Sequence, residues 1–167
     1  DILRARDDIR VLIDTENHGK PHQINRAVRE TTSDVIVFAD ARQTFEKNAI
    51  QMLVRNFSDP AIGAVSGELV FVSPEDHTER SIGLYWRYEK MLRKAESAVD
   101  STLGVTGAIY AIRREHFSPI PDDTILDDVE IPLRAFRSGY RVVFEPKATA
   151  YDTCLLYTSP SPRDRTR

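Results

Sequence analysis

The sequence predicts an α/β fold with a mostly parallel central sheet flanked by helices. Short runs rich in valine and isoleucine alternate with segments of helical apolar spacing, and the connections between them are short and polar. The apolar run at residues 35–38 ends in Ala39 and then Asp40, which is typical of a buried parallel strand that brings a carboxylate to its C-terminal edge. Open α/β sheets bind ligands at that edge.

Asp40 and Arg42 place an acid and a cation two residues apart after this strand. Such a pair suits an anionic, metal-bridged ligand such as a nucleotide diphosphate. A turn with an exposed salt bridge explains the same residues equally well.

The composition is that of one soluble globular domain: the chain has 167 residues, of which 41% are hydrophobic and 29% charged. No apolar run approaches the roughly 18 residues of a membrane span. Residues 154–167 (CLLYTSPSPRDRTR) resemble a translated sequencing adapter, so we expect a partial domain at 1–153 and a disordered, non-native tail. Without this tail the net charge moves from -3 to -5, because the tail holds three arginines and one aspartate.

Two classes of function are excluded by these counts. The domain has no basic stripe, so nucleic acid is not an expected partner. The single cysteine, Cys154, lies in the tail, which leaves the domain without a disulfide, a thiol nucleophile or a structural zinc site.

At the N-terminus, residues 1–8 are predicted to end a polar helix and residues 9–13 (IRVLI) to form a strand. Because an α/β domain normally opens with a strand, we expect a first βα unit upstream. A helix is predicted from Pro21 to about Glu30. Gly19 and Lys20 precede it, where backbone N–H groups and a lysine favour an anion. A glycine turn with a solvated lysine is the simpler alternative.

The middle of the chain predicts a helix capped by Thr44 and ending near Phe57, and then a strand at residues 64–72. Gly67 indicates a bulge or a close backbone approach within that strand. The helix at residues 82–97 carries a wide aromatic band, which we expect to be core, although such rings also stack on sugars. The band consists of Tyr85, Trp86, Tyr88, Met91 and Leu92.

Residues 103–114 (LGVTGAIYAIRR) predict a small-residue turn that leads into a strand ending in two arginines. Small residues admit a ligand close to the backbone and paired guanidiniums can hold phosphates, but a hairpin with a solvated basic end is equally consistent. Asp127 and Asp128 stand just before a predicted helix that Gly139 closes. The helix dipole accounts for one acid only. A strand at residues 141–144 is followed by an expected edge excursion.

Taken in order, these parts resemble the family 2 inverting glycosyltransferases with the GT-A fold, and most closely the membrane polysaccharide synthases. The resemblance covers residues 9–152 and depends on the order of its motifs: GK before a helix, FADAR, VSG, an aromatic helix, GVTGAIYAIRR, and LDD before a helix and GYRVVFEPKA. It implies a transferase that moves a sugar, expected to come from a UDP-sugar, to a glycan or lipid-linked acceptor with inversion.

For the donor, the resemblance implies that Asp40 is the first acid of a DxD-like motif and contacts Mg²⁺ or Mn²⁺. Arg42 stands where the second acid is usual. Either Asp40 and the diphosphate hold the metal alone, or Arg42 partly replaces it as a diphosphate clamp. Lys20 resembles a residue that contacts the nucleotide base or phosphate.

For the acceptor, the resemblance implies that Asp128 is the catalytic base, because an attacking hydroxyl must lose its proton. Asp127 then either sets the electrostatic field around Asp128 or caps the helix. The acceptor-side loop and its following basic pair comprise Gly104, Thr106, Gly107, Arg113 and Arg114.

Two other functions remain open from the sequence: a sugar-phosphate nucleotidyltransferase of similar layout, and a non-catalytic domain that binds nucleotide sugars. For the full-length transferase the resemblance implies a place at the cytoplasmic face of the inner (plasma) membrane. The membrane would be reached only through segments outside this soluble chain.

Overall fold

The computed structural model describes residues 9–72, 79–102 and 104–153, and for residues 79–87 and 153 it describes the backbone alone. The predictions for residues 1–8, for residues 73–78 of the polar loop, for the side chains of Tyr85 and Trp86, and for the tail lie outside this range. In chain order the elements are α1 (Gly19–Arg29), β1 (Val35–Ala39), β2 (Thr44–Phe45), α2 (Ala49–Val54), η2 (Arg55–Ser58), β3 (Ile62–Val72), α3 (Glu79–Val99), β4 (Ile109–Arg113), η3 (Arg114–His116), α4 (Asp127–Arg137) and β5 (Arg141–Thr153).

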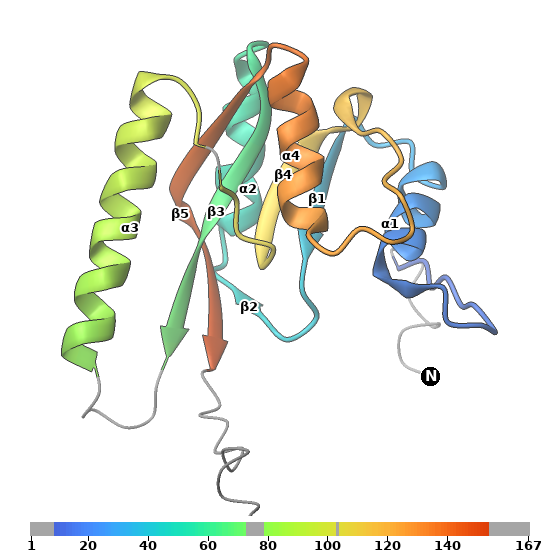
Figure 1. Ribbon diagram of the computed structural model, residues 1–167, viewed down its shortest axis with the longest axis horizontal. Coiled ribbons are helices and arrows are strands. Elements are labelled where there is room, and N and C mark those ends of the chain that lie inside the picture. The colour runs from blue at the N-terminus through green and yellow to red at the C-terminus, as the bar shows by residue number, and fades with distance from the viewer. Residues whose placement is uncertain (1–8, 73–78, 103, 154–167) are drawn as a thin grey trace, which may run out of the picture.

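A five-stranded mixed sheet forms the centre of the molecule, in the order β1-β4-β3-β5-β2 (Figure 1). Helix α4 covers one face and α2 the other, while α3 runs beside β5 and α1 lies next to β1. An α/β arrangement is therefore observed, as predicted.

The strand directions differ from the mostly parallel sheet that we expected. Among the described strands, only β3 and β5 are parallel; β1 with β4, β3 with β4, and β2 with β5 are antiparallel. The cause lies in the connection between α3 and β4, which runs back along the sheet. The backbone N–H of Thr102 donates to Val142 and that of Thr106 to the Ser66 hydroxyl, so β4 begins at the end where β1 finishes.

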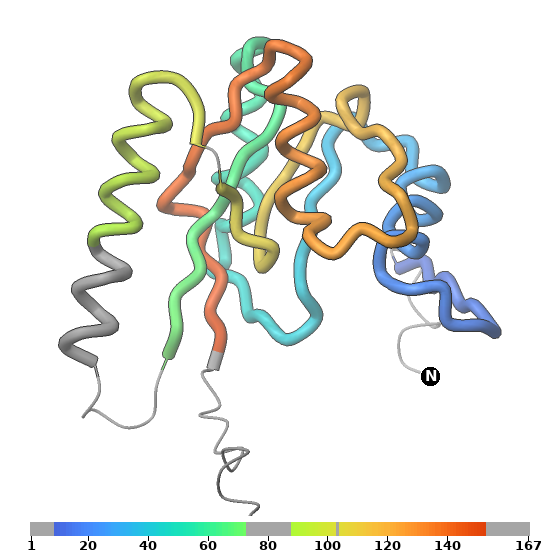
Figure 2. The backbone as a smooth tube through the Cα atoms, viewed as in Figure 1, coloured from blue at the N-terminus to red at the C-terminus, as the bar shows by residue number. Residues whose placement is uncertain are grey.

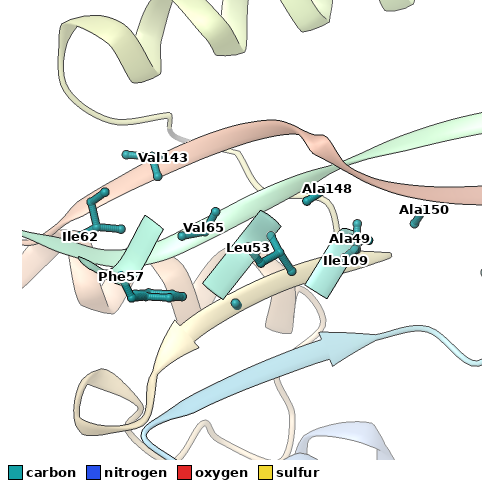
Figure 3. Packing of buried hydrophobic residues seen from close by; sticks show 10 residues of the cluster. Ala49, Leu53, Phe57, Ile62, Val65, Ile109, Val143, Ala148 and Ala150 are labelled. Atoms are coloured by element: carbon teal, nitrogen blue, oxygen red, sulfur yellow. The ribbon is translucent and has the colours of Figure 1, made fainter. Parts of the chain in front are cut away.

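Two hydrophobic clusters fill the space on either side of the sheet, because the residues of β4 alternate between its faces. Ile109 and Ala111 pack with Leu53 of α2, as Figure 3 shows for Leu53 and Ile109. Tyr110 and Ile112 pack with α4. The chain path that produces these layers can be followed in Figure 2.

Several local predictions were wrong. Residues 9–14 form no strand; instead Arg26 of α1 holds this segment through the Ile13 carbonyl and the Asp14 carboxylate. Strand β1 is consequently half-buried and has a ladder partner only in β4 within the described sheet. Thr44 lies in β2 and caps no helix, because α2 begins only at Ala49.

Strand β5 is longer than predicted, since it runs through the expected edge excursion to Thr153 with a register shift relative to β3. Gly67 sits at that shift, and a methyl group there would lie 2.4 Å from the Ala148 carbonyl oxygen. The predicted bulge and close approach are therefore both confirmed. Of the aromatic band on α3, the described side chains of Tyr88, Met91 and Leu92 are exposed, so the expected core role was wrong for them.

Candidate active site

One end of the sheet gathers chemically active side chains from four separate segments. Lys20 lies in the first turn of α1, where Gly19 adopts φ +82° and donates its N–H to the Asn17 side chain. Asp40 directly follows β1, and Asp127 and Asp128 open α4. Because β1 ends where β4 begins, the turn before β4 reaches the same place.

The ammonium group of Lys20 joins two of the carboxylates. Its Nζ lies 3.0 Å from Asp127 Oδ2 and 3.7 Å from Asp40 Oδ1. Burial of Lys20 would lower its pKa, but the hydrogen bond to Asp127 and the charges of the three neighbouring carboxylates outweigh this effect and raise the pKa above its usual value. The lysine therefore stays cationic at neutral pH.

Asp127 and Asp128 face different surroundings, although they are adjacent in the first turn of α4. Leu126 is the N-cap residue, so neither acid caps the helix, but both benefit from the positive end of its dipole. The Asp127 side chain is only 9% exposed and pairs with Lys20. Asp128 instead lines a cleft and lies against Gly107.

Gly107 sets how closely the turn approaches Asp128. A methyl group on Gly107 would lie 2.8 Å from Asp128 Oδ2, which is shorter than real side chains tolerate. Thr106 is fixed beside it by the hydrogen bond from its N–H to Ser66. Gly104 differs, because a methyl group there would meet no atom within 4 Å.

The cleft beside Asp128 has a volume of about 250 Å³ and lies between β3, α3 and the turn before β4. Its lining residues are Glu68, Leu69, Glu89, Lys90, Arg93, Val105, Thr106, Gly107, Asp128 and Phe144. Lys90 pairs with Glu68 at 2.6 Å and Arg93 with Glu89 at 3.5 Å. These charged residues were missed from the sequence, because only the aromatic band of α3 was considered on this helix.

Arg42 lies in the loop after β1, where its Nε is 3.0 Å from Asp152 Oδ2. Gln43 donates to the same carboxylate oxygen, also at 3.0 Å. Asp152 is 4% exposed, and no sequence pattern linked it to this loop, because Gln43 and Asp152 are 109 positions apart. The guanidinium of Arg42 is therefore already paired with a buried acid, although the Arg42 side chain itself is 77% exposed.

Arg113 and Arg114 are not brought to this site. Both lie at the opposite end of β4, since Arg113 pairs with Val35 whereas Ile109 pairs with Ala39 next to Asp40. Arg113 donates to the carbonyl oxygens of Ile62, Phe57 and Asp59, and the exposed Arg114 starts η3. The antiparallel direction of β4 explains the separation, so we do not retain these arginines as acceptor-side residues.

The acidic end of the sheet, which carries Asp40, Asp127 and Asp128, suits a divalent cation only if a ligand completes the coordination of that cation. In the described parts of the chain, no three acidic, histidine or cysteine side chains gather closely enough to hold a metal. Mg²⁺ commonly binds through one or two carboxylates and completes its shell with phosphate oxygens and water. Asp40, with a side chain 42% exposed, fits that pattern.

The fold and the site together define the class of protein. The α/β fold matches GT-A glycosyltransferase structures, as the sequence predicted. The chain belongs to the glycosyltransferase-like family 2, whose model matches residues 2–166. That range includes most of the C-terminal tail, so it does not separate the tail from the domain. Family membership favours a glycosyltransferase over a nucleotidyltransferase.

Curated relatives include polysaccharide synthases. The chain is 22% identical over 146 residues to a poly-β-1,6-N-acetyl-D-glucosamine synthase of Staphylococcus aureus, covering 81% of this chain and 34% of the relative. It is 26% identical over 148 residues to an N-acetylglucosaminyltransferase of Rhizobium sp. (strain N33), covering 81% and 33%. The chain thus spans about a third of the length of these relatives. Among the described helices, none combines the length and apolar character that a membrane crossing needs.

Solved structures support the same fold. The mannosyltransferase PcManGT from Pyrobaculum calidifontis, in complex with GDP-Man and Mn²⁺, superposes with a TM-score of 0.74 at 25% identity, over 90% of this chain and 41% of that one. A glucosyl-3-phosphoglycerate synthase from Mycobacterium tuberculosis has a TM-score of 0.50 at 16% identity, over 83% and 48%, and shows the fold alone.

Proposed function

We propose that this protein transfers a sugar from a nucleotide-sugar donor to an acceptor hydroxyl with inversion, and that Asp128 is the general base. The observation that carries the proposal is that two features lie together at one end of the sheet. A cationic lysine bridges Asp40 and Asp127, and a cleft opens beside the adjacent Asp128.

On the donor side, Lys20 and Asp40 would bind the diphosphate. The ammonium group of Lys20 complements the phosphate charge, and the first turn of α1 adds N–H groups and the positive end of its dipole. A divalent cation bound by Asp40 and the diphosphate would add positive charge at the leaving group. The exposed guanidinium of Arg42 would contact a phosphate while its Nε remains on Asp152.

The choice of donor rests on resemblance. Likeness to polysaccharide synthases and to relatives named for N-acetylglucosamine favours a UDP-sugar. The structural neighbour PcManGT holds GDP-Man with Mn²⁺, so a donor screen should contain both nucleotides.

On the acceptor side, the cleft would bring a sugar hydroxyl to Asp128. Leu69, Val105 and Phe144 offer apolar contact, and the paired charges of Lys90 and Glu68 offer hydrogen-bond partners, a mixture that suits a glycan. The likeness to polysaccharide synthases supports a glycan or lipid-linked acceptor at the cytoplasmic face of the plasma membrane. The membrane would be reached through segments outside the described chain.

The chemistry follows from these positions. The acceptor oxygen attacks the anomeric carbon as its proton passes to the Asp128 carboxylate, and the bond from that carbon to the diphosphate oxygen breaks on the opposite side. The nucleoside diphosphate leaves with the electron pair of that bond, and the charge of Lys20 stabilises it. Attack from the face opposite the leaving group inverts the anomeric configuration.

The test replaces the base without changing its size. In Asp128→Asn we expect kcat to fall by about 10²–10⁴-fold, because the proton acceptor is lost, while calorimetric binding of UDP with Mn²⁺ stays within about threefold. The matched control is Asp123→Asn, the same substitution at an exposed aspartate in the loop before α4. This variant should transfer sugar at the rate of the parent.

Turnover of Asp128→Asn within a few-fold of the parent would assign the base elsewhere. If the parent chain binds the donor but transfers no sugar, the result would instead favour a non-catalytic binding domain. The observation that supports this alternative is Arg42, which stands where a second metal-binding acid is usual and is paired with Asp152.

A further inference from the structure

Tyr110 of β4 carries a buried hydroxyl that the proposed chemistry does not use. Its side chain is 1% exposed, and its hydroxyl has no hydrogen-bond partner among the described residues. Buried polar groups are nearly always paired, because leaving one unpaired costs free energy. An unpaired buried hydroxyl therefore points to a partner that is engaged only in another state.

The ring of Tyr110 is held firmly at the acidic end of the sheet. It stacks on Phe38, with ring centroids 4.6 Å apart and planes 11° from parallel. Phe38 is its ladder partner in β1 and lies two residues before Asp40. Tyr110 also belongs to the hydrophobic cluster that contains Ile131 of α4, one turn after Asp127.

The carboxylates whose charges act on the hydroxyl come from α4 and from the loop after β1. Asp127 and Asp128 belong to α4, Asp40 follows β1, and Lys20 of α1 bridges Asp40 and Asp127. Burial, followed by the charges of Asp127, Asp128 and Asp40, raises the pKa of Tyr110 far above its usual value. The phenol is thus a hydrogen-bond donor at every pH at which a transferase works.

Asp127 needs a second partner when a donor binds. Its carboxylate is almost fully buried and is paired with Lys20, the lysine proposed to contact the diphosphate. If Lys20 turns toward a phosphate, the buried carboxylate loses that pairing, and an unpaired buried charge is costly. The unpaired hydroxyl of Tyr110 stands in the same acidic neighbourhood.

We propose that Tyr110 is a positioning residue for the acidic pair, whose hydroxyl donates a hydrogen bond to Asp127 when the donor diphosphate draws Lys20 away. This inference rests on the proposed function. Through Asp127, the hydrogen bond would hold the start of α4 and keep Asp128 directed at the acceptor.

The test is Tyr110→Phe, with Tyr151→Phe as the matched control. Tyr151 donates its hydroxyl to Glu46 at 3.1 Å, so its hydroxyl already has a partner. UDP with Mn²⁺ is added to each protein, and the tyrosine absorption band is followed by ultraviolet difference spectroscopy. We expect a shift to longer wavelength in the parent and in Tyr151→Phe, and none in Tyr110→Phe.

Stability and kinetics separate positioning from a structural role. Tyr110→Phe should keep or raise the thermal unfolding midpoint without ligand, because it removes an unpaired hydroxyl and keeps the stacked ring. With donor and acceptor, kcat should fall about tenfold and the donor KM should rise severalfold, because the variant lacks a hydrogen bond that forms only when the donor is bound. The pH below which kcat declines should move upward, because a carboxylate without its donor is protonated more easily.

A lower unfolding midpoint with an unchanged band and pH profile would overturn the inference and leave Tyr110 structural. The proposed function is judged separately by Asp128→Asn. If that variant loses transfer while Tyr110→Phe matches the parent, only the inference on Tyr110 fails. If the parent binds neither UDP nor GDP with Mn²⁺, both fail.

Discussion

At the level of single residues, Lys20 decides the electrostatics of the site. Its ammonium group lies between two carboxylates that are far apart in the sequence, and it offsets part of their mutual repulsion. A diphosphate bound here, as we propose, would compete with Asp127 for the same cation. The donor would therefore change the partners of a buried acid as it binds.

Gly107 provides a second test at the residue scale. In Gly107→Ala the new methyl group would meet Asp128 Oδ2 at 2.8 Å, so the carboxylate or the turn must move. Because a small displacement of a catalytic group is costly, we expect kcat to fall by about 10–100-fold. Steady-state transfer assays with a fixed donor would measure the loss.

Gly104→Ala is the matched control for this change, since an added methyl group there has open space. We expect its unfolding midpoint and the pH profile of its transfer rate to equal those of the parent. Equal kinetic losses in the two variants would assign the effect to the loop itself and not to the position of Asp128.

At the level of elements, the sheet positions the site because its two faces are fixed by different helices. Helix α2 anchors one face through Leu53, which is fully buried, whereas α4 anchors the other through Ile131. Of these two helices, only α4 carries site residues. The packing of α2 should therefore contribute to stability without directly contributing to chemistry.

Leu53→Ala tests this division. Removal of the buried side chain leaves a cavity against the sheet, and we expect a loss of about 2–5 kcal/mol in the free energy of unfolding. Ile50→Ala, at a 52% exposed position of the same helix, should change it by no more than about 0.5 kcal/mol. Urea unfolding of both variants gives the comparison, and similar values for the two would refute the assigned packing.

At the level of the whole molecule, buried carboxylates of β5 tie distant segments to the sheet. Asp152 holds the loop after β1 through Arg42 and Gln43. Glu145, 6% exposed, holds η2 through Arg55 at 2.7 Å and through Asn56. Such contacts join segments that are far apart in the sequence. Because they involve carboxylates, they make the stability of the fold depend on pH.

Glu145 makes the pH dependence testable. Burial would raise its pKa, but hydrogen bonds from Arg55, from the Lys147 N–H and from Asn56 outweigh this and lower the pKa below its usual value of 4.5. The carboxylate thus stabilises the folded chain above pH 4.5, and this contribution is lost as the pH falls through the lowered pKa.

In Glu145→Gln we expect the free energy of unfolding at pH 7 to be about 1–3 kcal/mol lower than in the parent. The difference should shrink as the pH drops below 4.5, because the parent then also loses the charge. Urea unfolding at pH 7 and near pH 3 measures both values. A difference that is constant with pH would show that the charge of Glu145 does not stabilise the fold.

The sequence by itself determined the fold class, the family, and the helices and strands whose apolar periodicity is strong, among them α1, β3 and α4. It also singled out Lys20, Asp40, Asp127 and Asp128, because polar residues directly after a strand or at the start of a helix are recognisable from local pattern alone.

Only the tertiary structure decided the rest. The direction of β4, and with it the removal of Arg113 and Arg114 from the site, depends on how the connection after α3 returns along the sheet. The Arg42–Asp152 pair, the cleft at Lys90 and the unpaired hydroxyl of Tyr110 arise from contacts between segments far apart in the chain. Local propensity carries no information on such contacts, since they depend on which surfaces meet when the layers pack.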